Sequence, residues 1–247
     1  VAQDTSYYGK KMGDSENLGN LLEELSGIEA CRWIRVLYAH PAHLGKRTLE
    51  AIASSPRICS YLDLPIQHIN DKILKKMGRP AGRSKIEEVI KTARKLVAGL
   101  SIRTTLMTGF PGEGEEEFKE LVEFVREIEF DHLGVFTYSP ERGTPAARFS
   151  DHVDPELAGA RRDRLLEIQQ QISGRRLRDR IGKEEEVIVD GYFPEAGSKL
   201  MIGRTRQQAP LIDGLVVIEG GDMSPGDLVR VRLSDSSEYD LYGQRVG

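Results

Sequence analysis

The residues best placed to carry out chemistry follow a predicted buried strand at 103–108. Gly109, Pro111, Gly112 and Glu113 end this strand in a tight polar turn, because glycine and proline interrupt regular structure. In parallel α/β folds, ligands bind at the C-terminal ends of the strands, where this turn lies. The turn is therefore a candidate ligand-binding element. The alternative interpretation is a purely structural βα turn with a glycine at a tight bend.

His40 and His43 form an H-x-x-H pair, a spacing that occurs in metal sites. No third candidate ligand lies close to them in the sequence, so we interpret the pair as loop histidines. Cys31 and Cys59 are the only cysteines, and their wide spacing excludes both a close-spaced metal motif and a disulfide framework. Scarce cysteine is typical of cytoplasmic proteins.

Predicted strands near residues 33, 61, 104 and 133 position the candidate residues. The strands alternate with helical patterns at a spacing of roughly 30 residues, which is typical of parallel βαβ units. Val1 would be the tail of one more strand. No G-x-G-x-x-G fingerprint follows any strand, so the alternation favours a partial parallel (β/α) barrel over a dinucleotide-binding sheet. At most five strands are too few to close the usual eight-stranded barrel.

Three helices of this first part can be predicted in detail. Acidic residues crowd the first turn of a helix after the 109–113 turn, and an apolar stripe follows at helical spacing, made of Phe118, Leu121, Val122, Val125 and Ile128. Asn70 is placed to cap a short helix. Ser84 and Glu87 have capping-box spacing, so we expect Ser84 to begin the next helix.

The segment from Asp154 to Ile181 combines a helical apolar stripe with many arginines. The stripe consists of Leu165, Ile168 and Ile172. The arginines are Arg161, Arg162, Arg164, Arg175, Arg176, Arg178 and Arg180. Two interpretations stay open. The arginines form either a solvated helix face with i,i+4 ion pairs or a face that meets an anionic partner or an acidic domain.

The last part of the chain, 183–247, consists of five short predicted strands separated by Gly-, Pro- and Asp-rich turns. This pattern predicts a small antiparallel β-barrel of OB-like size, a class that often binds nucleic acid. From Glu184 onward, however, the chain has six basic and twelve acidic residues. Because phosphate binding relies on Lys and Arg, this balance favours docking of a basic protein. A local basic face around Arg230 and Arg232 stays open.

The composition is that of an ordinary globular protein, with 247 residues of which 39% are hydrophobic and 30% charged. No run of about 18 apolar residues exists, and no signal-peptide pattern begins the chain, so we expect a cytoplasmic monomer without a membrane span. Val1 looks like the end of a strand, so we expect the sequence to begin inside a longer protein. The expected division is a partial barrel at 1–150, a connecting arginine-rich helix at 151–182 and the small barrel at 183–247.

Together these motifs resemble the radical S-adenosylmethionine methylthiotransferases over the whole chain. The matching stretches are Gln-Asp-Thr at 3–5, Leu-Pro-Ile-Gln at 64–67, Thr-Gly-Phe-Pro-Gly-Glu at 108–113 and the Tyr-Ser-Pro stretch at 138–147. Each motif is weak alone, and the set is specific. The small barrel looks like the TRAM domain of that family.

The resemblance implies S-adenosylmethionine as a cofactor. It places Gln3, Asp4, Gln67 and the turn Gly109–Glu113 along that molecule. Candidate wall residues for cofactor or substrate are Tyr38, His68 and Tyr138, which lie at predicted strand ends. Aromatic packing at the rim is the alternative for the two tyrosines. His68 has the alternative role of a polar cap on the following helix.

The resemblance also implies four-iron–four-sulfur clusters held by cysteine thiolates. Family members carry a Cys-x-x-x-Cys-x-x-Cys loop for one cluster, and three further cysteines in a preceding domain for a second. Cys31 and Cys59 do not have either spacing. We therefore expect no metal ligand in the chain as given, and we expect that it does not turn over by itself. No catalytic residue can be assigned.

Two branches of the family act on different substrates. One modifies the adenosine beside the anticodon of tRNA, and the other modifies the β-carbon of an aspartate in ribosomal small-subunit protein twelve. Residues 63–68 and 238–243 are similar to the ribosomal-protein branch, and the acidic barrel favours the same branch because ribosomal proteins are basic. Partner-binding candidates are Arg230, Arg232, Tyr239, Asp240 and Tyr242.

Three other functions remain as alternatives to the ribosomal-protein enzyme. One is a tRNA adenosine methylthiotransferase. Another, of a different class, is a non-catalytic module that binds a ribosomal protein or RNA. A cofactor-free barrel lyase or isomerase is disfavoured, because no paired acid and base stand out at the strand ends.

Overall fold

The computed structural model describes residues 2–10, 17–192 and 200–247. The chain divides into two compact units, Val1–Gln169 and Gln170–Gly247. The boundary falls inside the long helix α6, Pro155–Arg178, so this helix contributes residues to both units. The connecting arginine-rich helix predicted at 151–182 contains α6 within its bounds.

The first unit alternates strands and helices. Its strands are β1 (Ile34–Val36), β2 (Ile58–Asp63), β3 (Ser101–Thr108) and β4 (His132–Thr137). Its helices are α1 (Leu18–Ser26), α2 (Lys46–Ser54), α3 (Asp71–Lys76), α4 (Arg83–Leu96), α5 (Glu115–Ile128) and the first part of α6, with short 3-10 turns at Thr5–Tyr7 and Ala146–Arg148.

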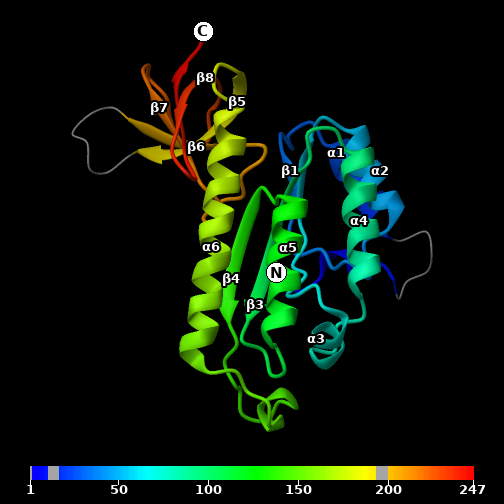
Figure 1. Cartoon of the computed structure of the whole chain (residues 1–247). Coiled ribbons are helices and arrows are strands. Elements are labelled where there is room, and N and C mark those ends of the chain that lie inside the picture. The colour runs from blue at the N-terminus through cyan, green and yellow to red at the C-terminus, as the bar shows by residue number, and fades with distance from the viewer. Residues whose placement is uncertain (1, 11–16, 193–199) are drawn as a thin grey trace. The chain divides into compact units, whose positions relative to one another are not determined.

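The four strands form one parallel sheet in the order β1-β2-β3-β4, as the βαβ spacing predicts. The sheet follows the chain order, and Figure 1 shows β3 and β4 side by side in green. All strands therefore end at the same edge of the sheet, which we call the strand-end edge. The further strand predicted at Val1 lies outside the described residues.

The helices of this unit arise from the predicted apolar stripes. In α5 the side chains of Phe118, Leu121 and Val125 are buried, and the Glu117 carboxylate accepts a hydrogen bond from the Gly114 N–H at the start of the helix. In α3 the Asn70 side chain caps the N–H groups of Lys72 and Ile73, as expected. These caps and stripes are local signals, so the sequence reveals them directly.

The start of α4 differs from the prediction. The helix begins at Arg83 after Gly82, and Ser84 is not its cap. Instead, the carboxylate of Asp71 accepts the Arg83 N–H at 2.7 Å, so a residue of the preceding helix satisfies this exposed donor. A capping box needs only local spacing, but a carboxylate from another helix is invisible in the local pattern.

The strand predicted near residue 61 is β2, which ends at Asp63. Pro65 has no N–H to donate, and Gln67 has a φ of 71°, which is outside the strand region. Gln67 still forms one isolated parallel bridge to Leu106. Segment 64–70 therefore leaves the sheet in an irregular backbone conformation.

The second unit contains a closed barrel built from β5 (Glu184–Tyr192), β6 (Met201–Thr205), β7 (Val216–Glu219), β8 (Leu228–Ser236) and β9 (Leu241–Arg245). The strand order is β5-β6-β7-β9-β8. The prediction of a small barrel is confirmed, but one pair, β7 with β9, is parallel. A closed ring with an odd number of strands cannot alternate direction throughout, so one parallel pair is required.

The barrel has its own apolar core. Inward-facing side chains of all five strands, joined by Leu177 of α6 and Met223, are buried: Val187, Val189, Met201, Val216, Ile218, Val229, Val231, Leu233 and Leu241. Strand β8 alternates these buried residues with the exposed Arg230 and Arg232, as its sequence predicts. In the part of the chain that the structure describes, no helix is both long and apolar enough to cross a membrane.

Candidate functional site

At the strand-end edge, hydrogen bonds join the segments that follow β1, β2 and β3, which we call the exits of these strands. The Thr5 N–H donates to the Tyr38 carbonyl at 3.0 Å, which ties the N-terminal loop to the end of β1. The Tyr38 N–H donates to the Asp63 carboxylate at 2.9 Å, and the Gln67 N–H donates to the Thr105 carbonyl at 2.9 Å. These hydrogen bonds hold the predicted site residues that follow β1, β2 and β3 at the same edge of the sheet.

Two residues at the strand-end edge have a strained backbone. Tyr38 has a φ of 59° and Gln67 a φ of 71°, values that non-glycine residues rarely adopt. Such strain costs on the order of 1–3 kcal/mol and is concentrated at functional sites. The Tyr38 side chain is 44% exposed, so it does not pack into the interior. Both observations favour a binding role for this edge.

The turn after β3 is held by a side chain of its own motif. The Glu113 carboxylate accepts the Gly109 N–H at 3.0 Å, and Glu113 is 3% exposed. Gly109 has a φ of 77°, and a Cβ there would lie 2.3 Å from the Cβ of Ala158 in α6. Only glycine therefore fits between the turn and this helix. Glu113 faces the interior and shapes the turn, so only the turn backbone is available to a ligand.

Glu113 belongs to a buried polar group of three residues, His68, Glu113 and Arg161, which we call the buried triad. The Arg161 guanidinium donates to the Glu113 carboxylate at 2.8 Å and to its backbone carbonyl at 2.8 Å. His68 Nδ1 accepts the Asn70 N–H at 3.0 Å, so we place its ring proton on Nε2, which lies 3.4 Å from the second Glu113 oxygen. The triad connects the exit of β2, the turn after β3 and helix α6.

The triad changes the interpretation of two predicted residues. His68 is fully buried, and its ring accepts the Asn70 N–H at the start of α3. This position is closer to the predicted polar cap on the helix than to a wall of the cofactor or substrate site. Arg161 is 4% exposed, although its segment was interpreted as a solvated or partner-facing arginine face. The sequence contained no signal that separates Arg161 from its six neighbours of the same type.

A second polar group surrounds Asp4 at the β1 side of the edge. The Asp4 carboxylate accepts hydrogen bonds from the Ser6 hydroxyl and, at 2.5 Å, from His43. Burial would raise the pKa of Asp4, but the hydrogen bonds from Ser6 and His43 outweigh it and lower that pKa. His40 Nδ1 accepts the Ala42 N–H at 3.1 Å. Both histidines lie outside the helices and strands, as predicted, and both have hydrogen-bond partners there.

Burial, together with the positive charge of Arg79, lowers the pKa of His40 to about 4. Between pH 7 and 5 the unfolded chain therefore takes up a proton at His40 that the folded chain does not. The free energy of unfolding therefore falls by about 1 kcal/mol as the pH drops through this window. This figure allows for solvent screening of a half-buried ring. We expect His40→Asn, whose oxygen can still accept the Ala42 N–H, to remove this part of the loss.

Urea unfolding at pH 7 and pH 5 measures the effect. Between pH 7 and 8.5 the original chain and His40→Asn should change in parallel, because His40 is neutral in both states there. Equal losses of stability between pH 7 and 5 in the two proteins would contradict the assignment.

Arg79 is a site residue that sequence reasoning missed. Its guanidinium donates to the Pro65 carbonyl at 2.6 Å, and burial lowers its pKa while Asp4 partly opposes the shift. Among the described residues, no carboxylate forms an ion pair with it. A half-buried guanidinium without a carboxylate partner, at the edge that holds Asp4 and His40, is suited to an anionic ligand group. Only the fold brings Arg79 here, from the turn after α3.

The β4 side of the edge is aromatic. Tyr138 packs against Phe110 of the turn at 5.1 Å between ring centres and stacks on His152 at 6.1 Å. Its hydroxyl is buried and has no hydrogen-bond partner among the described residues. A buried hydroxyl without a partner costs about 1–3 kcal/mol, so a polar ligand atom would relieve it. Tyr138 therefore combines rim packing with an unused polar group.

These features fit a ligand that carries both charged and apolar parts. Arg79 offers a cation, the Tyr138 hydroxyl is unpaired, and no hydrogen bond to the Gln67 side-chain amide occurs within the described residues. The exposed Tyr38 ring supplies an apolar surface at the same edge, whereas Phe110 is buried. S-adenosylmethionine has a carboxylate, an amine, a ribose and an adenine, so its functional groups match this set. Gln3 is exposed next to Asp4, in a position open to the same ligand.

Metal chemistry has no comparable support in the described part of the chain. No group of three or more His, Cys, Asp or Glu side chains there could hold a metal ion. Cys59 is fully buried and Cys31 is half-buried, and the two do not form a disulfide.

The partner-binding candidates of the barrel fall into two kinds. Arg232 is ion-paired with Glu184 at 2.6 Å, and Asp240 accepts the Leu215 N–H at 2.8 Å, so both have structural contacts. Arg230, Tyr239 and Tyr242 are exposed. Only the second group is free of an assigned structural role in the described contacts.

Two family models match the chain. The model of the radical SAM superfamily matches residues 9–125, and the model of the TRAM domain matches residues 181–246. The first match covers β1 to β3 with their helices, and the second covers the closed barrel.

The chain is similar over its length to proteins named ribosomal protein uS12 methylthiotransferase RimO. The protein from Geobacter sulfurreducens is 44% identical over 246 residues, which are 100% of this chain and 55% of the relative. The protein from Desulfotalea psychrophila is 44% identical over 243 residues, 98% of this chain and 55% of the relative. The chain thus spans about half the length of these relatives. Coproporphyrinogen III oxidase (HemN) of Escherichia coli, a radical SAM enzyme, is similar in structure with a TM-score of 0.49 and 16% identity, over 70% of this chain and 44% of that one.

Proposed function

Because this chain belongs to the radical SAM superfamily and carries a TRAM domain, we propose that it forms part of an enzyme that adds a methylthio group to ribosomal protein uS12. The acceptor is the β-carbon of an aspartate. The observation that carries the proposal is the strand-end edge, where unused polar groups gather beside a glycine turn shaped by buried Glu113. The names of the 44% identical relatives support the choice of substrate.

In this proposal S-adenosylmethionine lies along the strand-end edge. Arg79 binds its carboxylate, and the Gln67 amide hydrogen-bonds its ribose or methionine part. The backbone of the Gly109–Glu113 turn runs beside the adenine, and Gln3 and Asp4 approach the methionine amine. When bound, S-adenosylmethionine supplies the methyl group and, with a four-iron–four-sulfur cluster, the radical that removes a hydrogen atom from the substrate.

The cysteine ligands of the clusters belong, in this proposal, to the part of the enzyme that corresponds to the rest of the longer relatives. Cys31 and Cys59 take no part. The role of the described residues is to bind and orient S-adenosylmethionine and to hold the turn in place through the buried triad. In this proposal, residues 1–247 do not turn over without that part of the enzyme.

The barrel surface supports a basic protein as the partner. Its arginines are largely neutralised by acidic neighbours on the barrel itself: Arg204 lies 3.2 Å from Asp190, Arg206 lies 3.7 Å from Glu186, and Arg232 lies 2.6 Å from Glu184. Phosphate contacts require free cations, so a tRNA substrate is the weaker alternative. The substrate protein is rich in Lys and Arg, as ribosomal proteins are, and meets the acidic surplus.

The proposal is tested by mass spectrometry on cells from which the gene has been deleted. We expect the uS12 peptide with the acceptor aspartate to lose the mass of one methylthio substitution, while the methylthio-adenosine content of tRNA is unchanged. Restoring the gene should restore the uS12 modification. Loss of the tRNA modification with intact uS12 would support the tRNA branch instead.

A further inference from the structure

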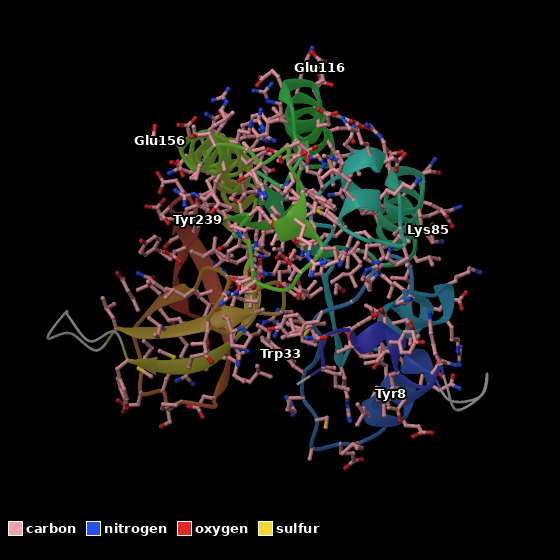
Figure 2. All side chains as sticks on the ribbon, turned by 90° about the horizontal axis from the view of Figure 1, so that it is seen from below. Tyr8, Trp33, Lys85, Glu116, Glu156 and Tyr239 are labelled. Carbon is pink, nitrogen blue, oxygen red and sulfur yellow. The ribbon has the colours of Figure 1, made fainter. Side chains whose placement is uncertain are left out.

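Two loops of the barrel unit present apolar side chains to solvent. The first, Gln207–Gly214, connects β6 to β7, and its Leu211 is 103% and Ile212 45% exposed. The second, Ser237–Asp240, connects β8 to β9, and its Tyr239 is 47% exposed. Figure 2 labels Tyr239 on this turn. We call the surface formed by Pro210, Leu211, Ile212 and Tyr239 the apolar tip.

The base of the first loop is firmly built. Gln208 and Ala209 are each 1% exposed. The Gln208 side-chain oxygen accepts hydrogen bonds from the Thr205 N–H at 2.9 Å and the Thr205 hydroxyl at 3.1 Å. The Asp213 carboxylate accepts the Ala209 N–H at 2.7 Å. The exposed residues 210–212 therefore project from an ordered base that closes on itself.

Leu211 itself adopts an unfavourable backbone conformation. Its φ is 69°, in the left-handed region that glycine and asparagine adopt most readily. A leucine in this conformation with a fully exposed side chain gains neither backbone nor burial energy within the chain. Strain of this kind is concentrated at binding and functional sites. Leu211 is thus presented outward at the expense of local stability.

The two loops lie against each other. A Cβ on Gly214 would lie 1.8 Å from the Tyr239 carbonyl oxygen, so only glycine allows this approach. The Asp240 carboxylate accepts the Leu215 N–H at 2.8 Å, and the Leu241 N–H donates to the Leu215 carbonyl at 2.9 Å. These contacts place the backbone of Tyr239 beside the end of the loop that carries Leu211, so the two loops that carry the apolar tip are joined.

The two loops that form the tip are acidic, although Arg178 of α6 lies near Glu238. Residues 207–214 and 234–243 contain four acidic residues and no Lys or Arg. Of the acids, Asp235 and Glu238 are exposed, and the charge of Glu238 contributes, after burial, to the raised pKa of Tyr239. An apolar anchor with an acidic surround complements a protein that has an apolar pocket bordered by Lys or Arg. A phosphate backbone is the weaker match, because phosphate contacts rely on Lys or Arg and neither loop contains one.

We propose that the apolar tip is the docking surface for the basic ribosomal protein uS12, with Leu211 as the anchor that enters a pocket of the partner. The proposal rests on the proposed function for the identity of the partner. Leu211 and Ile212 are buried on docking, Tyr239 packs beside them, and Asp235 and Glu238 face basic side chains of uS12. Affinity comes mainly from the anchor, and the acids accelerate the encounter.

The test measures binding of purified uS12 to the 247-residue chain by biolayer interferometry. Leu211→Asn removes the apolar anchor and suits the left-handed backbone, so the loop should keep its shape. We expect uS12 to bind this variant roughly ten- to a hundredfold more weakly, with the change mainly in the dissociation rate. Leu211→Met should bind within about threefold of the original chain, because it keeps the apolar contact.

Tyr192→Asn is the matched control, because Tyr192 is also a large exposed apolar residue, at 62%, and pairs with Met201 at the end of β6 opposite the first loop. It should bind uS12 like the original chain. Asp235→Asn with Glu238→Gln should slow association and weaken its dependence on salt. Thermal unfolding of each variant checks the fold, and Leu211→Asn should melt no lower than the original chain.

Equal affinity of Leu211→Asn and the original chain for uS12 would overturn the docking surface and leave the proposed function in place. Absence of uS12 binding by the original chain would overturn both. Binding of purified tRNA that depends on Leu211, or self-association that disappears in Leu211→Asn, would likewise overturn uS12 as the occupant of the tip.

Discussion

Replacement of Arg161 by Met should lower the free energy of unfolding of the chain by about 3–5 kcal/mol, the usual effect of breaking a buried ion pair. The substitution leaves the Glu113 carboxylate without its 2.8 Å partner in an interior where its side chain is fully buried. It also removes the guanidinium from above the Phe118 ring, 5.1 Å away. Urea unfolding followed by circular dichroism measures the change.

A second substitution shows whether the buried charge is the cause. Glu113→Gln in the Arg161→Met background should recover about 1–2 kcal/mol, because a neutral amide no longer buries an unpaired charge and its oxygen still accepts the Gly109 N–H. Strictly additive effects of the two substitutions would contradict a coupled triad. Arg162→Met is the matched control: its side chain is 41% exposed and pairs with Asp163, so a change within about 0.5 kcal/mol is expected.

Replacement of Arg79 by Met should weaken binding of S-adenosylmethionine to the full-length protein by about a hundredfold. A charge-assisted pair between a half-buried guanidinium and a carboxylate contributes roughly 2–3 kcal/mol, and 1.4 kcal/mol is a factor of ten. Isothermal titration calorimetry under anaerobic conditions measures the affinity. Arg79→Lys keeps the charge without the planar fork and should give an intermediate affinity.

The control for this prediction is Arg83→Met. Arg83 is also an arginine of the α3–α4 region, but its guanidinium is ion-paired with Glu87 and Glu120. It should bind S-adenosylmethionine like the original protein. Unchanged affinity in Arg79→Met would refute the assignment of the ligand carboxylate to this residue, while the fold of the edge would stand.

The parts of the fold that the sequence predicted depend on local patterns. The stripe of Phe118, Leu121 and Val125 placed α5, and the alternation around Arg230 and Arg232 placed β8. Such signals depend only on residue spacing, because helices and strands have fixed periods. The order of parallel strands follows from the same spacing together with the preference for βαβ connections.

The parts that the sequence could not predict depend on tertiary contacts. Arg161 has the same local surroundings as the other arginines of α6, and only its contact with Glu113 distinguishes it. Asp71, which satisfies Arg83 at the start of α4, and Arg79, which reaches the exit of β2, act across turns that local patterns do not describe. Leu211 was not selected because exposure cannot be read from a residue type.

The strand-end edge and the buried triad explain each other. The triad anchors the exit of β2 through His68, the turn after β3 through Glu113, and helix α6 through Arg161. The strained backbone at Gln67 and the glycine turn at Gly109 are held in position by these buried contacts. A binding edge built from strained exits needs such support, because strained conformations persist only where the surroundings impose them.

The most direct test of the central claim uses the purified full-length protein, with uS12 as the substrate. S-adenosylmethionine with a deuterated methyl group, sulfide and a reductant are added under anaerobic conditions, and the uS12 peptides are measured by mass spectrometry. We predict one deuterated methylthio group on an aspartate of uS12 and none on tRNA added to the same reaction. Label on tRNA adenosine, with uS12 unmodified, would contradict the account.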